Sequence, residues 1–302
     1  MLVTGGTGLL GWWLVKAFLE TGFEVHATYH TRKPLGPNGA SWRRLELADP
    51  ADVARVFEEA RPDVVVHAAA YTDVDGCERS PGLAYRVNYL GTLAVAREAA
   101  RRGAFMVYVS TDYVFDGERG LYREEDTPRP INYYGLTKLL GEASTAALPG
   151  DSSLIVRVSG LYGYSPTGKR NFGVNALEAL LEGRSVKAFD DQYLSPTYAP
   201  WLAGAIAKLV SSGASGVLHV AGERMSRYEF ALRLAEAVGA DPSLVRPTPM
   251  SSARLAARRP RDSSLDVRRA KALGITHPPA AQAIRGFVEE YLRARTEDPS
   301  TL

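Results

Sequence analysis

The chain contains a single cysteine, Cys77, among its 302 residues. One cysteine cannot form an intrachain disulfide, so we expect a fold without disulfides in a reducing, cytoplasmic setting. No apolar run reaches the ~18 residues that a membrane-spanning helix needs, so we predict no membrane partner. The chain begins Met1-Leu2-Val3-Thr4-Gly5, which we interpret as leaving no room for a signal peptide.

An excess of either charge is also missing. Lys and Arg number 36 against 34 Asp and Glu, which gives a net charge of +2. This balance is not typical of a dedicated nucleic-acid binder, so we expect no nucleic-acid partner. The five histidines show no metal-binding spacing such as H-x-x-x-H, and we predict no metal site. Hydrophobic residues make up 45% of the chain, as in a globular protein with a substantial core.

Short apolar runs alternate with helical patterns in the first half of the chain. We predict strands at 2–4, 23–29, 63–67, 105–109 and 154–158, and helices at 9–20, 51–60, 82–102 and 134–147. This rhythm predicts an α/β fold with a doubly wound, Rossmann-like parallel sheet. The second half is less regular, with helices predicted at 172–182, 198–211, 226–238 and 281–295, a strand at 216–220, and loops near 163–168, 191–200 and 241–250.

A glycine cluster lies between the first predicted strand and the first predicted helix. Its residues fit two spacings, G-x-G-x-x-G from Gly6 and G-x-x-G-x-x-G from Gly5. Either spacing allows backbone to approach a pyrophosphate at a helix N-terminus, so the cluster predicts a dinucleotide site. The predicted contacts are Gly5, Thr7, Gly8, Leu9, Leu10 and Gly11.

The end of the second predicted strand bears on which dinucleotide binds. An NAD site usually carries an acidic residue there, but the stretch Thr28–Lys33 has none. Arg32 and Lys33 could pair with a 2′-phosphate, although they could also be solvated loop cations. We therefore favour NADP(H), keep NAD(H) as an alternative, and predict that His30 and Arg32 contact the cofactor.

Tyr134 and Lys138 stand one helical turn apart at the start of a predicted helix. An ammonium about 5 Å from a phenol stabilises the phenolate by on the order of 3 kcal/mol, or about 2 pKa units. We therefore expect Lys138 to lower the pKa of Tyr134, so that the phenol can exchange a proton with a carbonyl or alcohol. Ser110 and Thr111 follow the strand predicted at 105–109; either hydroxyl could polarise that carbonyl, or simply cap a turn.

With these motifs assembled, the chain resembles the extended short-chain dehydrogenases/reductases, and within them the dTDP-4-dehydrorhamnose reductase family. The glycine spacing starting at Gly5 matches the family, as does Tyr134 with Lys138. The segments that carry the resemblance further are His67–Thr72, the unchanged Ser-Thr-Asp-Tyr-Val-Phe run at 110–115, Asp191–Ala199 and Arg259–Asp266.

The resemblance implies roles for individual residues. It makes Thr111 the catalytic hydroxyl, beside Tyr134 and Lys138, and implies that Lys138 also holds the nicotinamide ribose. It places Asp112 and Tyr113 at the substrate, and Arg259 at a nucleotide-sugar pyrophosphate. Further cofactor contacts are expected from Ala68, Ala69 and Ala70.

At two positions the roles of the family's residues do not carry over directly to this chain. Where the family carries a tryptophan near the sugar, this chain has Gly160, so we expect a sugar pocket that is wider or differently lined. Asn88 lies in the predicted helix 82–102; the resemblance implies a proton relay there, and a structural hydrogen bond is an equally good account.

The resemblance implies NADPH-dependent reduction of a keto group on a nucleotide-sugar, most simply a dTDP-4-keto-6-deoxy sugar. The alternatives are an epimerase or dehydratase acting on a nucleotide-sugar, or a non-catalytic subunit resembling the β subunit of methionine adenosyltransferase. A homodimer is compatible with the sequence. We assign 1–160, with return segments near 190–222 and 262–275, to an NADP-binding Rossmann domain, and about 161–189, 223–261 and 276–302 to a substrate-binding region.

Overall fold

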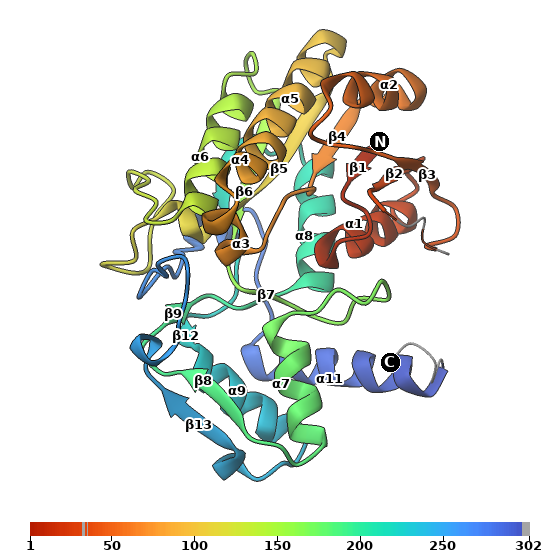
Figure 1. Ribbon diagram of the computed structural model, residues 1–302. Coiled ribbons are helices and arrows are strands. Elements are labelled where there is room, and N and C mark those ends of the chain that lie inside the picture. The colour runs from red at the N-terminus through yellow and green to blue at the C-terminus, as the bar shows by residue number, and fades with distance from the viewer. Residues whose placement is uncertain (32–33, 35, 298–302) are drawn as a thin grey trace.

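The computed structural model describes residues 1–31, 34 and 36–297 (Figure 1). Its centre is a seven-stranded sheet in which every neighbouring pair is parallel. In spatial order the strands are β3 (Ser41–Arg44), β2 (His26–Tyr29), β1 (Leu2–Thr4), β4 (Val64–His67), β5 (Phe105–Thr111), β6 (Ser153–Val158) and β11 (Gly216–His219). The direction of strand addition reverses between β1 and β4, which is where ligands bind in such sheets.

Helices cover both faces of this sheet, which confirms the predicted doubly wound fold. On one face lie α1 (Leu9–Glu20) and α8 (Ala199–Ser211), whose apolar residues share a core cluster with β1 and β6. The other face is covered by α2 (Pro50–Ala60), α5 (Gly91–Arg102) and α6 (Tyr133–Ala146). The short helices α3 (Val74–Arg79) and α10 (Arg268–Ala272) lie in connections.

A second apolar cluster lies below the sheet in Figure 1. It is formed by α7 (Phe172–Leu181), α9 (Arg227–Ala237) and α11 (Ala280–Glu297), packed with the parallel pair β8 (Val186–Phe189) and β13 (Val245–Thr248). Two short pairs lie between the clusters, β7 (Leu161–Tyr162) with β10 (Thr197–Tyr198), and β9 (Tyr193–Leu194) with β12 (Met225–Ser226). The residue boundaries that we assigned to the two regions stay a prediction.

Several predicted elements differ from the structure. The predicted loop at 241–250 contains strand β13, whose Pro247 is tolerated because β13 has a single strand partner. The polar strand β3 was not predicted; its charged side chains suit the edge of a sheet. The second strand begins at His26 and not at 23, and β5 runs two residues beyond 109, so that Thr111 is its last residue.

The predicted helix 82–102 is not a regular α-helix. It consists of α4 (Pro81–Ala84), a π-helical turn (Tyr85–Leu90) and α5. Within that turn the buried Asn88 side chain accepts from the Tyr71 N–H at 2.7 Å and donates to the Tyr71 carbonyl at 3.0 Å. The structure thus shows the structural hydrogen bond that we considered for Asn88, and these bonds fix the segment after β4.

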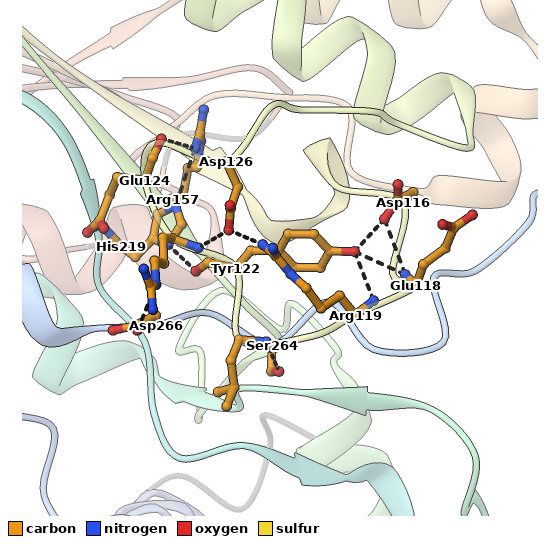
Figure 2. Close-up of polar contacts among 12 residues, drawn as sticks. Asp116, Glu118, Arg119, Tyr122, Glu124, Asp126, Arg157, His219, Ser264 and Asp266 are labelled. Carbon is orange, nitrogen blue, oxygen red and sulfur yellow. Dashed lines mark hydrogen bonds and ion pairs between the residues drawn. The ribbon is translucent and has the colours of Figure 1, made fainter.

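Backbone hydrogen bonds connect the loop after β5 to the segment 262–266, which is distant along the chain (Figure 2). The Tyr122 N–H donates to the Ser264 carbonyl at 2.9 Å, and the Asp266 N–H donates to the Tyr122 carbonyl at 2.8 Å. The His219 Nδ1 of β11 lies 3.0 Å from that same carbonyl oxygen. These bonds hold segment 262–266 against the carboxyl end of the sheet. Within the described ranges, no helix is long and apolar enough to cross a membrane.

Candidate active site

The glycine turn between β1 and α1 leaves no room for side chains at two of its positions. Gly5 has φ +71°, and a Cβ there would lie 2.7 Å from the Ala69 Cα. A Cβ on Gly11 would lie 2.0 Å from the Gly5 carbonyl oxygen. Gly8 caps α1 without a side-chain hydrogen bond, so the helix N-terminus is open to an anion. This cradle fits a dinucleotide pyrophosphate, with the spacing Gly5-Gly8-Gly11.

A cavity of about 720 Å³ runs from this turn along the carboxyl ends of the strands. All the described residues that we predicted to contact the cofactor line it, from the glycine turn, His30, the segment 68–70 and the pair Tyr134 and Lys138. Arg32, and Lys33 beside it, lie outside the described residues. The predicted preference for a 2′-phosphate through Arg32 therefore stays a prediction.

A carboxylate that we did not predict lies at the His30 end of the cavity. Glu46, just after β3, also lines the cavity, and its Oε2 lies 2.8 Å from His30 Nε2. The hydrogen bond with His30 lowers the pKa of Glu46. The residues at the end of the second strand could not reveal Glu46, because Glu46 follows the neighbouring edge strand β3.

The three predicted catalytic residues meet at the opposite end of the same cavity. Thr111 ends β5, whereas Tyr134 and Lys138 lie on the first two turns of α6. The Asn132 side chain caps this helix by accepting from the Gly135 N–H at 2.8 Å. Lys138 is 3% exposed, and its Nζ donates to the Val109 carbonyl at 2.8 Å. The fold therefore brings Thr111, Tyr134 and Lys138 together, while their chemical roles stay a prediction.

The expected effect of Lys138 on the phenol is wrong. Burial raises the pKa of Tyr134, and the Asp112 carboxylate adds to that rise, while a hydrogen bond with Thr111 opposes it. Burial also lowers the pKa of Lys138 to about 7, with Glu142 acting against it. Desolvation of both side chains, and not attraction between phenolate and ammonium, sets these two pKa shifts. A neutral Tyr134 can still donate a proton.

Asp112 and Tyr113 form the start of a 3₁₀ turn after β5. Both were predicted to contact substrate. The Asp112 carboxylate lines the cavity but is 2% exposed, and it accepts hydrogen bonds from Ser159 at 2.8 Å and Ser263 at 2.5 Å. The Tyr113 hydroxyl accepts from Gln192 Nε2 at 3.3 Å, and its ring packs edge-on against Tyr134. The structure thus shows Asp112 bonded within the protein.

Gly160 does not leave an empty space in the cavity wall. A Cβ at this position would lie 2.1 Å from the Leu194 Cδ1, and Gly160 has φ +51°. Leu194 occupies the volume that a larger residue 160 would need. Of the two expectations for this pocket, the structure supports a different lining at this point and not a wider one.

Arg259 does not line the cavity. Its guanidinium forms two hydrogen bonds with the Asp75 carboxylate, at 2.8 and 3.2 Å, and its Nη1 also donates to the Ala257 carbonyl at 2.9 Å. The predicted contact between Arg259 and a pyrophosphate therefore lacks support from the geometry, since those donors are engaged elsewhere.

Other cations, which we did not predict, line the cavity from the second apolar region. They are Lys169, Arg170 and Arg227. Arg227 donates from Nε to Gln192 Oε1 at 2.7 Å, and Arg170 pairs with Glu178. For Lys169 and Arg170 the available signal was their position directly after the loop predicted near 163–168, and composition alone does not distinguish such cations from solvent-exposed charge.

The loop that carries Lys169 contacts the glycine turn directly. Thr167 Oγ1 donates to the Thr7 carbonyl at 2.7 Å, and Trp13 Nε1 of α1 donates to the Tyr164 carbonyl at 3.0 Å. These bonds join the two regions across the phosphate end of the cavity. One continuous site can therefore hold a dinucleotide along the sheet and a second anionic ligand against Arg227.

The comparisons with known proteins agree with this geometry. The model of the family described as RmlD substrate binding domain matches residues 1–293. A dTDP-4-dehydrorhamnose reductase of Mycobacterium tuberculosis is 39% identical over 271 residues, covering 87% of this chain and 83% of that protein. A bovine (Bos taurus) methionine adenosyltransferase 2 subunit beta is 32% identical over 284 residues, covering 91% and 82%.

A solved structure shows the same arrangement of the chain. The dTDP-4-dehydrorhamnose reductase of Bacillus anthracis, in complex with NADP, superposes with a TM-score of 0.82 at 31% identity, over 96% of this chain and 98% of that chain. The family match spans both the glycine turn and the Thr111–Tyr134–Lys138 cluster. The chain therefore belongs to the dTDP-4-dehydrorhamnose reductase family of the extended short-chain dehydrogenases/reductases.

Proposed function

We propose that this protein is a reductase that uses NADPH to reduce a keto group on a nucleotide-sugar, most simply dTDP-4-dehydrorhamnose. One observation carries the proposal: Thr111, Tyr134 and Lys138 line the same cavity as the open N-terminus of α1. The resemblance in sequence and the relatives named as reductases support it. NADH is the alternative cofactor, because the Glu46 carboxylate lies beside His30 at the end of the cavity where the adenosine ribose would bind.

In this mechanism, NADPH held by the glycine turn and the segment 68–70 would supply the hydride for the keto carbon. Tyr134 donates its phenolic proton to the oxygen, so that one hydride and one proton convert the ketone to an alcohol. The Thr111 hydroxyl orients and polarises that oxygen. Lys138, held by the Val109 carbonyl, would contact the nicotinamide ribose.

The nucleotide-sugar would extend from the catalytic end of the cavity towards the second region. Arg227 and Lys169, which both line the cavity, would supply positive charge for a pyrophosphate. A guanidinium can bind phosphate oxygens through two parallel N–H bonds. This assignment replaces Arg259, which pairs with Asp75.

The same geometry argues against a dehydratase. Sugar dehydration needs an acid and base free to act on the sugar carbons, but the Asp112 carboxylate is bonded to Ser159 and Ser263, and the next residue is Tyr113. An epimerase would return its hydride to the sugar, so it would consume no cofactor. Stoichiometric consumption of NADPH distinguishes a reductase from it.

The test is NADPH oxidation with dTDP-4-dehydrorhamnose, with the sugar product identified by NMR. We expect turnover by the wild type and a loss of about 10²–10⁴-fold in kcat for Tyr134→Phe, the usual contribution of a general acid. Cofactor binding, measured by protein fluorescence, should be unchanged in Tyr134→Phe. Equal activity of the two proteins would contradict the role of Tyr134.

The second candidate function is that of a regulatory subunit. It is favoured by the match to methionine adenosyltransferase 2 subunit beta over 91% of this chain. Its test is co-purification with a methionine adenosyltransferase catalytic subunit, together with a change in that enzyme's rate. Binding of such a subunit, combined with no NADPH oxidation on any keto-sugar, would favour regulation over catalysis.

A further inference from the structure

The buried Asp112 carboxylate is held by hydroxyls, and no cation of the described residues contacts it. Ser159 and Ser263 donate to its Oδ2 at 2.8 and 2.5 Å, and Thr111 donates to its Oδ1 at 3.1 Å. Within the part of the chain that the structure describes, no lysine, arginine or histidine pairs with Asp112. A buried carboxylate without a cation is costly, and perturbed carboxyls of this kind are concentrated at functional sites.

The contact with Thr111 has a consequence for catalysis. A threonine hydroxyl has one proton, and an ionised Asp112 carboxylate, which can only accept, takes that proton in the hydrogen bond at 3.1 Å. The Thr111 oxygen accepts from the Tyr113 N–H at 3.2 Å and is also hydrogen-bonded with Tyr134. A hydroxyl in this state can accept a hydrogen bond but cannot donate one to a substrate oxygen. Polarisation of a keto group requires donation.

We propose that Asp112 is a positioning residue that controls the direction of the Thr111 hydroxyl. When ionised, the carboxylate holds the Thr111 proton; when protonated from solvent, it releases Thr111 to donate to the keto oxygen. No covalent bond in the protein forms or breaks in this change. The inference rests on the proposed function, because it concerns how Thr111 acts on the substrate.

The donors around Asp112 are fixed, so the carboxyl cannot turn away from Thr111. The Ser159 oxygen accepts from the Ser195 N–H at 3.0 Å, which joins the end of β6 to the β9–β10 segment. Ser263 is held because its neighbour Ser264 accepts from the Leu121 N–H at 2.8 Å, beside the Tyr122 contacts of Figure 2. The hydroxyls that hold Asp112 therefore come from three segments of the chain: the end of β5, the residue after β6 and the segment 262–266.

The carboxyl titrates in an accessible pH range. Burial raises the pKa of Asp112 to about 6, while the hydrogen bonds from Ser263, Ser159 and Thr111 oppose the rise. The Asp112 charge acts on Tyr113 of its own turn and on Tyr134 of α6, and Arg227 of α9 and Arg259 act on Tyr113. Lys138 of α6 lines the same cavity, and burial lowers its pKa to about 7.

The first experiment follows the carboxyl directly, without turnover. A ¹³C NMR titration of labelled aspartate identifies the Asp112 signal by its absence in Asp112→Asn. Because each hydroxyl stabilises the ionised form, Thr111→Val and Ser263→Ala should each raise the apparent pKa of Asp112. Ser195→Ala removes a buried hydroxyl of the same layer that contacts Leu265 and not Asp112, so it should leave the titration unchanged.

A second measurement follows the same titration through the pH dependence of the free energy of unfolding. Because the folded pKa of Asp112 is raised, its contribution to stability is present below about pH 4 and is lost as the pH rises through about 6. The free energy of unfolding of the wild type should therefore fall relative to Asp112→Asn across that window. A constant difference between the two proteins would contradict the titration.

The third measurement is kcat for NADPH-dependent reduction of dTDP-4-dehydrorhamnose between pH 5 and 8. The wild type should lose activity by about tenfold per pH unit above the Asp112 inflection, and Asp112→Asn should lose that inflection. Ser263→Ala should move it to higher pH, and Ser195→Ala should not move it.

The outcomes separate the two ideas. An Asp112 titration that Thr111→Val does not shift overturns the inference, with or without turnover. A kcat profile of Asp112→Asn identical to that of the wild type also overturns it, since the Lys138 ammonium titrates near 7 in both proteins. A titration that responds to Thr111→Val in a protein that oxidises no NADPH refutes the proposed keto-sugar reduction and supports the hydroxyl contact itself.

Discussion

Two buried carboxylates lie at the carboxyl end of β5, and their surroundings differ. Behind the strand, Glu142 of α6 pairs with Arg157 of β6 through two hydrogen bonds, at 2.7 and 2.9 Å, with both side chains 5% exposed. Ser110 donates to the same carboxylate at 2.5 Å. Facing the cavity, Asp112 accepts hydrogen bonds from three hydroxyls and its own backbone N–H, and no cation of the described residues pairs with it.

This difference separates a polar group that stabilises the fold from one that is available for chemistry. A carboxylate matched by a guanidinium has its charge neutralised in place and joins α6 to the sheet. A carboxylate held by hydroxyls keeps a charge that can be removed by one proton near pH 6. The adjacent residues Ser110 and Thr111 thus have different partners. Ser110 donates a hydrogen bond to the Glu142 carboxylate, whereas Thr111 is hydrogen-bonded with Asp112 and Tyr134.

The largest effect should come from breaking the ion pair behind the strand. Arg157→Met leaves the Glu142 carboxylate buried without its cation, which should cost about 3–5 kcal/mol in the free energy of unfolding. Urea denaturation measures this loss. The double variant Glu142→Leu, Arg157→Met removes both charges and should recover most of it. A single variant as stable as the wild type would contradict the structural role of the pair.

Substitution of the two neighbouring hydroxyls, Thr111 and Ser110, tests whether they have separate roles. Thr111→Val keeps the shape of the side chain and removes the donor, so kcat for keto-sugar reduction should fall by about 10²-fold. Ser110→Ala removes one hydrogen bond to Glu142 and should lower the free energy of unfolding by about 1.5–3 kcal/mol with little change in kcat. If both variants lost activity equally, Thr111 and Ser110 would not belong to separate systems.

Two arginines give the smallest expected effect and test the same distinction. Arg227→Ala removes a cation that lines the cavity and should raise the KM for the nucleotide-sugar roughly tenfold, equal to about 1.4 kcal/mol, with kcat little changed. Arg259→Ala breaks the pair with Asp75 and should lower stability while leaving KM nearly constant. The reverse pattern would restore the original assignment of Arg259 to the substrate.

Local patterns were sufficient for much of the fold. The glycine turn, helix 9–20 and the start of α6 were predicted because each is specified by residues within one or two turns of chain. The strands β3 and β13 were missed because a polar edge strand and a strand containing proline lack the apolar run on which strand prediction depends. The π-helical turn depends on contacts between Asn88 and the distant Tyr71.

The site shows the same division. Sequence motifs were enough to predict that Thr111, Tyr134 and Lys138 lie together, since parallel strand ends and the first turn of the following helix share one edge. They could not predict that Arg259 would pair with Asp75, or that Arg227 and Glu46 would line the cavity. Those partners lie far apart along the chain, and their meeting depends on how the two regions pack.

The sequence by itself determined the parallel sheet, the phosphate turn and the residue types available for hydride-transfer chemistry, because these depend on local periodicity and on glycine geometry. Only the tertiary structure decided the charge of each group. Burial raises the pKa of Tyr134 and lowers the pKa of Lys138, and hydroxyls from three segments surround Asp112. The physical reason is that desolvation and hydrogen bonding are set by neighbours in space, which spacing along the chain does not specify.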